Sequence, residues 1–211
     1  MKAMKRYIPT LAVLALVAFT GYHSVYFRKL STMKSVQTGS FDAESFAARL
    51  WSGAVASAAD SAVVLGRLID ETVTGGTQVL ERRTHALAIG NYRYAMIRAE
   101  GVVKQFDSTE FLLSVPHADS SIGVRVALEY IYGNAIRDAS ASVQVKDFPN
   151  SSDLSAIAEA LNRMARKRVV IANDHILRAG DRLEVIGAVE LHREHLRWQG
   201  LEIHPVRITR K

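Results

Sequence analysis

The sequence predicts an α+β fold, in which an apolar N-terminal helix and a long amphipathic helix precede a small antiparallel β-barrel. Three observations predict it. Residues 7–27 contain no charged side chain. From residue 42 apolar side chains recur every three to four positions, and from Tyr92 they alternate with a period of two. The pattern divides the chain into an N-terminal segment 1–29, a polar tether 30–40, a helical segment 41–90 and a β-rich domain 91–211.

Composition limits the chemistry that the 211 residues can perform. There is no cysteine, which excludes disulfides, thiolate metal sites and cysteine nucleophiles. The net charge of +6 first suggests a polyanionic partner. However, residues 1–29 hold five of the 27 basic residues and no acidic one, so removing them leaves 22 basic against 21 acidic residues, a net charge of +1. The β-rich domain carries tyrosines that could stack on bases, but its strand charges alternate in sign, so we expect no nucleic acid partner.

The N-terminal segment has the layout of a membrane-directed sequence. Three basic residues precede the uncharged stretch 7–27 and two come after it. As a helix these 21 residues would reach about 31 Å, close to the thickness of the hydrocarbon core. We interpret the segment as an uncleaved signal anchor in the inner membrane, with the C-terminal domain facing the periplasm. Two alternatives remain, a signal peptide cleaved near Ala18-Phe19-Thr20 and a buried helix of a soluble protein. The flanking basic charge is nearly balanced, so the orientation relies on the general tendency of such N-terminal segments to export the chain on their C-terminal side.

The helical segment begins at Asp42, a residue type that caps helices. Gly75-Gly76 marks the end of this helix, and a second, shorter helix is predicted over residues 77–88. The predicted buried face of the long helix consists of small and apolar residues at helical spacing: Phe46, Leu50, Ala54, Ala58, Ser61, Leu65 and Leu68.

The β-rich domain contains five predicted strands and one helix. The strands are expected at 94–106, 111–116, 124–130, 183–191 and 196–209, with a further short strand at 142–145. Gly101 predicts a bend or bulge in the first strand, and Pro205 a bulge on an edge strand. The helix, predicted over 153–168, lies between the third and fourth strands. Three strands, a helix and two strands succeed one another in this order in the OB-fold, a small Greek-key barrel. The alternative is another arrangement of a helix on an antiparallel sheet.

The segment 133–165 is the most distinctive part of the domain because charged and amide side chains alternate with small ones. Arg137 and Asp138 could pair at the barrel rim, and Asn150, Ser151 or Ser152 could cap the next helix. The alternative is that these side chains only shape loops and helix ends. The candidate ligand- or partner-binding residues are Arg137, Asp138, Asp147, Phe148, Asn150 and Asn162.

Catalytic and metal-binding patterns are weak. His192, His195 and His204 could surround a metal, but no cysteine or closely spaced carboxylate pair completes the set. The sequence contains no G-x-S-x-G, Walker, H-E-x-x-H or G-x-G-x-x-G motif. We therefore expect no enzymatic activity, no cofactor and no metal.

Several short motifs, in order, carry a family resemblance. They are Phe41-Asp42-Ala43 followed by Leu50-Trp51, Glu100-Gly101-Val102-Val103, Gly133-Asn134-Ala135-Ile136-Arg137-Asp138-Ala139, Asp147-Phe148-Pro149-Asn150, Ala160-Leu161-Asn162, Gly180-Asp181, Gly187-Ala188 and Pro205-Val206. Across residues 41–209 the chain resembles a family of predicted periplasmic lipoproteins of unknown function. The resemblance implies export, a helical N-terminal segment and a compact β-rich domain. It also implies an accessory role and a protein partner, because genes of this family often lie beside those of sugar-type ABC transporters.

The sequence departs from this family where a lipoprotein would be lipidated. A lipobox ends with the lipidated cysteine, whereas here Gly21 is followed by Tyr22. Any membrane attachment must therefore come from the apolar residues 7–27. We expect a non-enzymatic accessory or interaction protein anchored in the inner membrane. The alternative is an extracytoplasmic binding protein for an oligosaccharide or another small ligand on the barrel face.

Overall fold

The computed structural model describes residue 19 and residues 41–88, 90–170 and 177–211. Residues 42–211 form one compact unit. The apolar stretch predicted as a membrane anchor lies outside the described residues except for Phe19, and the predicted tether lies wholly outside them. Within the described part of the chain, no helix combines the length and the apolar character needed to cross a bilayer.

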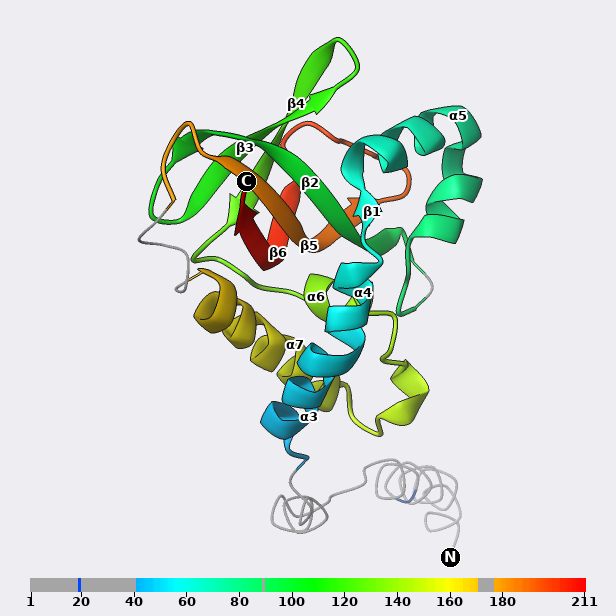
Figure 1. Cartoon of the computed structure of the whole chain (residues 1–211). Helices are drawn as coiled ribbons and strands as arrows, with labels where there is room; N and C mark the ends of the chain where they lie inside the picture. Colours follow the sequence, from blue (N-terminus) through cyan, green and yellow to red (C-terminus); the bar gives the residue numbers. More distant parts are fainter. Residues whose placement is uncertain (1–18, 20–40, 89, 171–176) are drawn as a thin grey trace, which may run out of the picture. The chain divides into compact units, whose positions relative to one another are not determined.

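The described residues contain a six-stranded sheet in which five strands close into a barrel (Figure 1). The strands are β1 (Val63–Val64), β2 (Tyr92–Phe106), β3 (Glu110–His117), β4 (Ser120–Ala127), β5 (Arg182–His192) and β6 (Glu202–Arg210). Their order is β1-β2-β3-β4-β6-β5, and β5 also pairs with β2. Within the barrel β4 and β6 are parallel and the other pairs are antiparallel. The predicted order of three strands, a helical region and two strands is confirmed.

The long strand β2 pairs with β5 along its first eleven residues and with β3 near its end. Gly101 permits this change of partner, because a Cβ there would lie 2.3 Å from the carbonyl oxygen of Ser114. The ladder to β3 shifts register between Val103 and Gln105, so the bulge expected near Gly101 lies at Lys104.

The bulge predicted at Pro205 is confirmed, because Gly187 of β5 faces Pro205 while its neighbour Ile186 faces Arg207. The extra residue is therefore Val206. The edge position predicted for this strand is wrong at its start, where Glu202 and Ile203 pair with β4 as well as lying beside β5. Pro205 lies beyond the pairing with β4, and its ladder partner is Gly187 of β5. A proline, which has no N–H, is tolerated at such a position.

The long helix predicted from residue 42 is interrupted. α3 (Ala43–Leu50), the π-turn Trp51–Val55 and α4 (Ala56–Asp60) succeed one another, and the Asp42 carboxylate caps α3 by accepting from the Ser45 N–H at 3.0 Å. The chain then extends into β1, which lies parallel to Ile97 and Arg98 of β2. The two β-branched valines of β1 favour this extended conformation over a helix.

α5 (Leu65–Arg83) comes directly after β1 and bends at Gly76, whose φ of +60° is left-handed. The helix end predicted at Gly75-Gly76 is thus a bend within α5, and the second helix predicted beyond it forms the far arm of α5.

Two short helical turns between β4 and β5 have no counterpart in the sequence predictions. α6 (Ala135–Ala139) has all five residues buried, and the 3₁₀ turn Val145–Asp147 occupies part of the segment predicted as a strand at 142–145, so that strand prediction is wrong. The predicted helix is confirmed as α7 (Ser151–Ala165), which continues as the π-turn Arg166–Val170. α6 contacts β2, β5 and α7, and thus lies between the barrel and the helices α3 and α7 (Figure 1).

Candidate functional site

The candidate site is a pocket of about 530 Å³ formed by one loop and two strands. The loop between β4 and α6 supplies Tyr130, Tyr132 and Asn134, β5 supplies Glu190, and β6 supplies Glu202 and His204. We name it the tyrosine pocket. Its residues come from parts of the sequence some 70 positions apart, which closure of the barrel brings together.

Two aromatic rings form one wall of the tyrosine pocket. The Tyr130 and Tyr132 side chains are 53% and 60% exposed, and their ring centroids are 6.1 Å apart with the planes tilted by 31°. The Arg166 guanidinium lies 5.8 Å from the Tyr132 ring centroid. Aromatic rings of this size usually lie in the core or in interfaces, so a neighbouring exposed pair indicates a binding surface.

A carboxylate and an imidazole also line the tyrosine pocket. His204 Nε2 lies 3.3 Å from a Glu202 carboxylate oxygen, and the Arg125 guanidinium lies 3.4 Å from the other. The hydrogen bond with His204 is the main cause that lowers the pKa of Glu202 below its ordinary value, and Arg125 adds to this effect against the opposing effect of burial. Glu202 is therefore ionised at neutral pH. His204 Nδ1 is buried without a hydrogen-bond partner among the described residues.

Glu190 connects the tyrosine pocket to Tyr94, a buried residue on the same face of the sheet. It stands directly opposite Tyr94 in the β2–β5 ladder. Burial, followed by the neighbouring Glu190 carboxylate, raises the pKa of the Tyr94 hydroxyl far above its ordinary value, so Tyr94 remains a neutral hydroxyl at all relevant pH values.

Two side chains of the α7 region hold the loop that carries the tyrosines. Asn162 Nδ2 donates to the Gly133 carbonyl at 2.9 Å, and Arg166 Nη1 donates to the Ile131 carbonyl at 3.0 Å. Gly133 has a φ of +72°, which the glycine allows without strain. Asn162, a residue predicted for the site, is buried and contacts the backbone of the pocket loop without lining the pocket.

Arg137 and Asp138 form the pair that the sequence suggested, but deep inside the protein. Their side chains are 4% and 3% exposed, and the guanidinium binds the carboxylate through two bonds of 2.7 and 3.1 Å. The remaining nitrogen, Arg137 Nη1, donates to the Leu154 carbonyl of α7 at 2.8 Å. The pair thereby connects α6 to α7 behind the pocket loop.

The other three predicted residues lie away from the tyrosine pocket. Asp147 and Asn150 are exposed. Asn150 occupies the N-cap position of α7 but makes no side-chain capping bond, so the predicted cap is wrong for this side chain. The Phe148 ring meets the Phe46 ring edge-on at 5.6 Å, which connects this loop to α3.

The three histidines considered as metal ligands have different neighbours in the structure. The His192 and His195 rings stack at 4.9 Å, whereas His204 pairs with Glu202. In the described part of the chain no three or more histidine or acidic side chains are grouped so that they could hold a metal ion.

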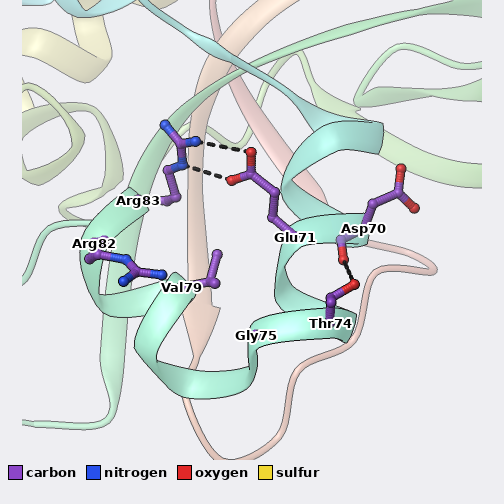
Figure 2. Close-up of a pocket in the computed structure, with 7 residues that line it drawn as sticks. All are labelled: Asp70, Glu71, Thr74, Gly75, Val79, Arg82 and Arg83. Carbon is purple, nitrogen blue, oxygen red and sulfur yellow. Dashed lines mark hydrogen bonds and ion pairs between the residues drawn. The ribbon is translucent and has the colours of Figure 1, made fainter.

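Figure 2 shows a larger pocket of about 690 Å³ inside the bend of α5. The Glu71 carboxylate there receives two bonds from Arg83, at 2.7 and 2.9 Å, and one from Arg67 at 2.7 Å. Because these charges already pair with one another across the bend, we assign this pocket a structural role in α5.

Sequence reasoning considered the tyrosines only as stacking groups for nucleic acid, and it missed Glu190 and Glu202. One signal was present, since Glu202 and His204 are two residues apart in a predicted strand and so share a face. The partnership of that face with residues 130–134 depends on barrel closure, for which the sequence holds no local signal.

Comparison with known proteins supports the fold and identifies the family. The crystal structure of an OB-fold protein from Thermotoga maritima is similar to this chain with a TM-score of 0.70 at 17% identity, over 81% of this chain and 99% of that one. At this identity the likeness shows the fold alone. No curated protein matches the sequence. The sequence profile of a family described as predicted periplasmic lipoprotein (DUF2291) matches residues 15–209. The chain therefore belongs to the DUF2291 family of predicted periplasmic lipoproteins.

Proposed function

We propose that this chain is a non-enzymatic periplasmic protein, attached to the inner membrane, that binds a small neutral sugar in the tyrosine pocket. The family description supports the periplasmic location and membrane association. The observation that carries the proposal is that the exposed pair Tyr130 and Tyr132 lines the same pocket as the ionised Glu202.

A sugar matches both kinds of group that line the pocket. The C–H face of a pyranose is apolar and can lie against an aromatic ring, while its hydroxyls donate to carboxylate oxygens. Glu202 already has two cationic or imidazole neighbours, Arg125 and His204, and Arg166 lies over Tyr132. Glu190 adds a second carboxylate to the lining, so the pocket offers hydrogen-bond acceptors to hydroxyl groups and disfavours an anionic ligand.

The state of Glu202 supports binding without catalysis. Glycoside hydrolysis needs a carboxylic acid with a raised pKa to protonate the leaving oxygen. Glu202 has the opposite shift, caused mainly by its hydrogen bond with His204. An ionised carboxylate accepts hydrogen bonds from sugar hydroxyls but is a poor general acid.

A thermal-shift screen of the purified full-length protein against neutral mono- and disaccharides tests this proposal. We expect at least one sugar to raise the melting temperature in a dose-dependent manner. The double variant Tyr130→Ser, Tyr132→Ser should lose this rise. The control Tyr92→Ser, which alters a 53% exposed tyrosine outside the pocket, should keep it. A flat response across the panel, or an unchanged rise in the double variant, would contradict the proposal.

Membrane attachment through residues 7–27 is the second part of the proposal, and it is supported by the family description together with the absence of cysteine. A periplasm-dependent reporter fused after Lys211 should be active, and the fusion should remain with the membrane fraction after a salt wash. A fusion that is produced at normal levels but has an inactive reporter would contradict the topology. The accessory role beside a sugar-type ABC transporter stays a prediction, which co-purification from membranes would test.

A further inference from the structure

A second hollow, of about 310 Å³, lies on β2 where β1 and the end of β3 approach it. It is lined by two arginines, Arg98 and Arg182, and by the apolar side chains of Val64, Val102 and Val115. We name it the arginine pocket. We propose that it binds a small organic carboxylate with an apolar body, independently of the ligand of the tyrosine pocket.

The arginines provide the first line of support. Arg98 Nε is buried and has no hydrogen-bond partner, and neither Arg98 nor Arg182 forms an ion pair with any residue that the structure describes. A shielded donor without an acceptor is unfavourable, and a carboxylate is the acceptor whose geometry matches a guanidinium. A bound carboxylate would supply the acceptor that the fold leaves out.

The neighbouring acidic groups leave a positive excess in this hollow. Glu100 lies on β2 between Arg98 and Val102 and also lines the pocket. Its cross-strand partner Glu184 is already bound by the Lys211 ammonium at 3.1 Å. Two guanidinium groups therefore face one carboxylate, which favours an anionic ligand.

The apolar lining limits the kind of anion. Val64 is 52% exposed although it belongs to the short strand β1, and Val102 and Val115 adjoin it across the hollow. A ligand that covers these side chains removes apolar surface from water, which an inorganic anion cannot do. The volume suits one ring or a short chain, near the lower limit of small-molecule pockets.

The two pockets lie toward opposite ends of β5 and share no lining residue. Arg182 is the first residue of β5, whereas Glu190 is the third from its end. Failure of the sugar proposal would therefore leave this inference unaffected.

Ligand-observed NMR on the full-length protein tests the inference with three probes: benzoate, its neutral isostere benzamide, and acetate, which lacks the apolar body. We expect saturable binding of benzoate, with benzamide and acetate each at least tenfold weaker. Failure of benzoate to bind, or equal binding of benzamide, would overturn the inference.

Charge variants locate the site. Arg98→Gln and Arg182→Gln should each weaken benzoate binding at least tenfold, while Arg197→Gln, which alters an arginine outside the pocket, should leave it unchanged. Melting temperatures measured in parallel show that each variant is folded. As a second probe of the site, Val64→Trp should block benzoate by filling the hollow. Unaltered binding in both Arg98→Gln and Val64→Trp would overturn the assignment.

Discussion

Replacing Asp138 by asparagine tests how much the buried pair in α6 stabilises the protein. The substitution keeps the size of the side chain, so no cavity forms, but it removes the charge that the Arg137 guanidinium faces at 2.7 and 3.1 Å. Both side chains are almost inaccessible to water, at 4% and 3% exposure. The guanidinium would thus remain buried without a negatively charged partner, although it would keep its hydrogen bond to the Leu154 carbonyl.

The expected loss of stability results from the burial of this ion pair. Removing one partner of a buried ion pair destabilises a protein by about 3–5 kcal/mol. For a compact unit of this size each kcal/mol lowers the melting temperature by about 2–4 °C, so Asp138→Asn should lower it by roughly 6–20 °C.

Circular dichroism melting of the full-length protein and its variants measures this shift. The matched control is Asp60→Asn, because the Arg207–Asp60 pair has a similar distance, 2.9 Å, but side chains that are 45% and 70% exposed. Exposed pairs contribute about 0–1 kcal/mol, so the control should shift the melting temperature by only a few degrees. Equal shifts in the two variants would refute the reasoning that burial sets the magnitude.

Three further predictions concern the pocket and the barrel. Asn162→Ala removes the bond to the Gly133 carbonyl and should cost about 1 kcal/mol of stability while weakening sugar binding, measured by calorimetry. Gly187→Ala places a Cβ 2.5 Å from the His204 carbonyl oxygen. It should lower the free energy of unfolding, measured by urea titration, by about 1–3 kcal/mol. The pKa of Glu202 is lowered in the folded state, so its stabilising contribution is complete above its ordinary value of 4.5 and is lost as the pH falls below that value. Glu202→Gln should therefore flatten the acid side of the stability profile, and an unchanged profile would contradict this assignment.

The barrel was predictable because its signals are local. Alternating apolar residues mark each strand, and Pro205 marks the bulge in β6. The family resemblance was equally accessible, because it depends on short motifs in a fixed order, and the match over residues 15–209 confirms it.

The parts that could not be predicted depend on contacts between distant segments. Val63 and Val64 continue a helical pattern in the sequence, but in the structure they pair with β2 and interrupt the helix. α6 is too short to show a helical period, and it buries Arg137 and Asp138, residues that a linear pattern places on a surface.

In the candidate site, too, the contacts between distant segments could not be predicted from the sequence. Arg137, Asp138 and Asn162 hold elements next to the tyrosine pocket through buried contacts, but they do not line the pocket. The pocket itself joins that segment to Glu190 and His204, and only the closed barrel places them together.

The most direct test of the proposed function is a spectrum of the full-length protein with ¹³C-labelled tyrosine rings, titrated with the panel of neutral sugars. The chain has seven tyrosines, so each ring signal can be assigned by single substitution. The proposal predicts that at least one sugar shifts the signals of Tyr130 and Tyr132 in a saturable manner and leaves Tyr92 unchanged. If no sugar shifts these two signals, or if the shifted rings lie elsewhere, the tyrosine pocket is not a sugar-binding site.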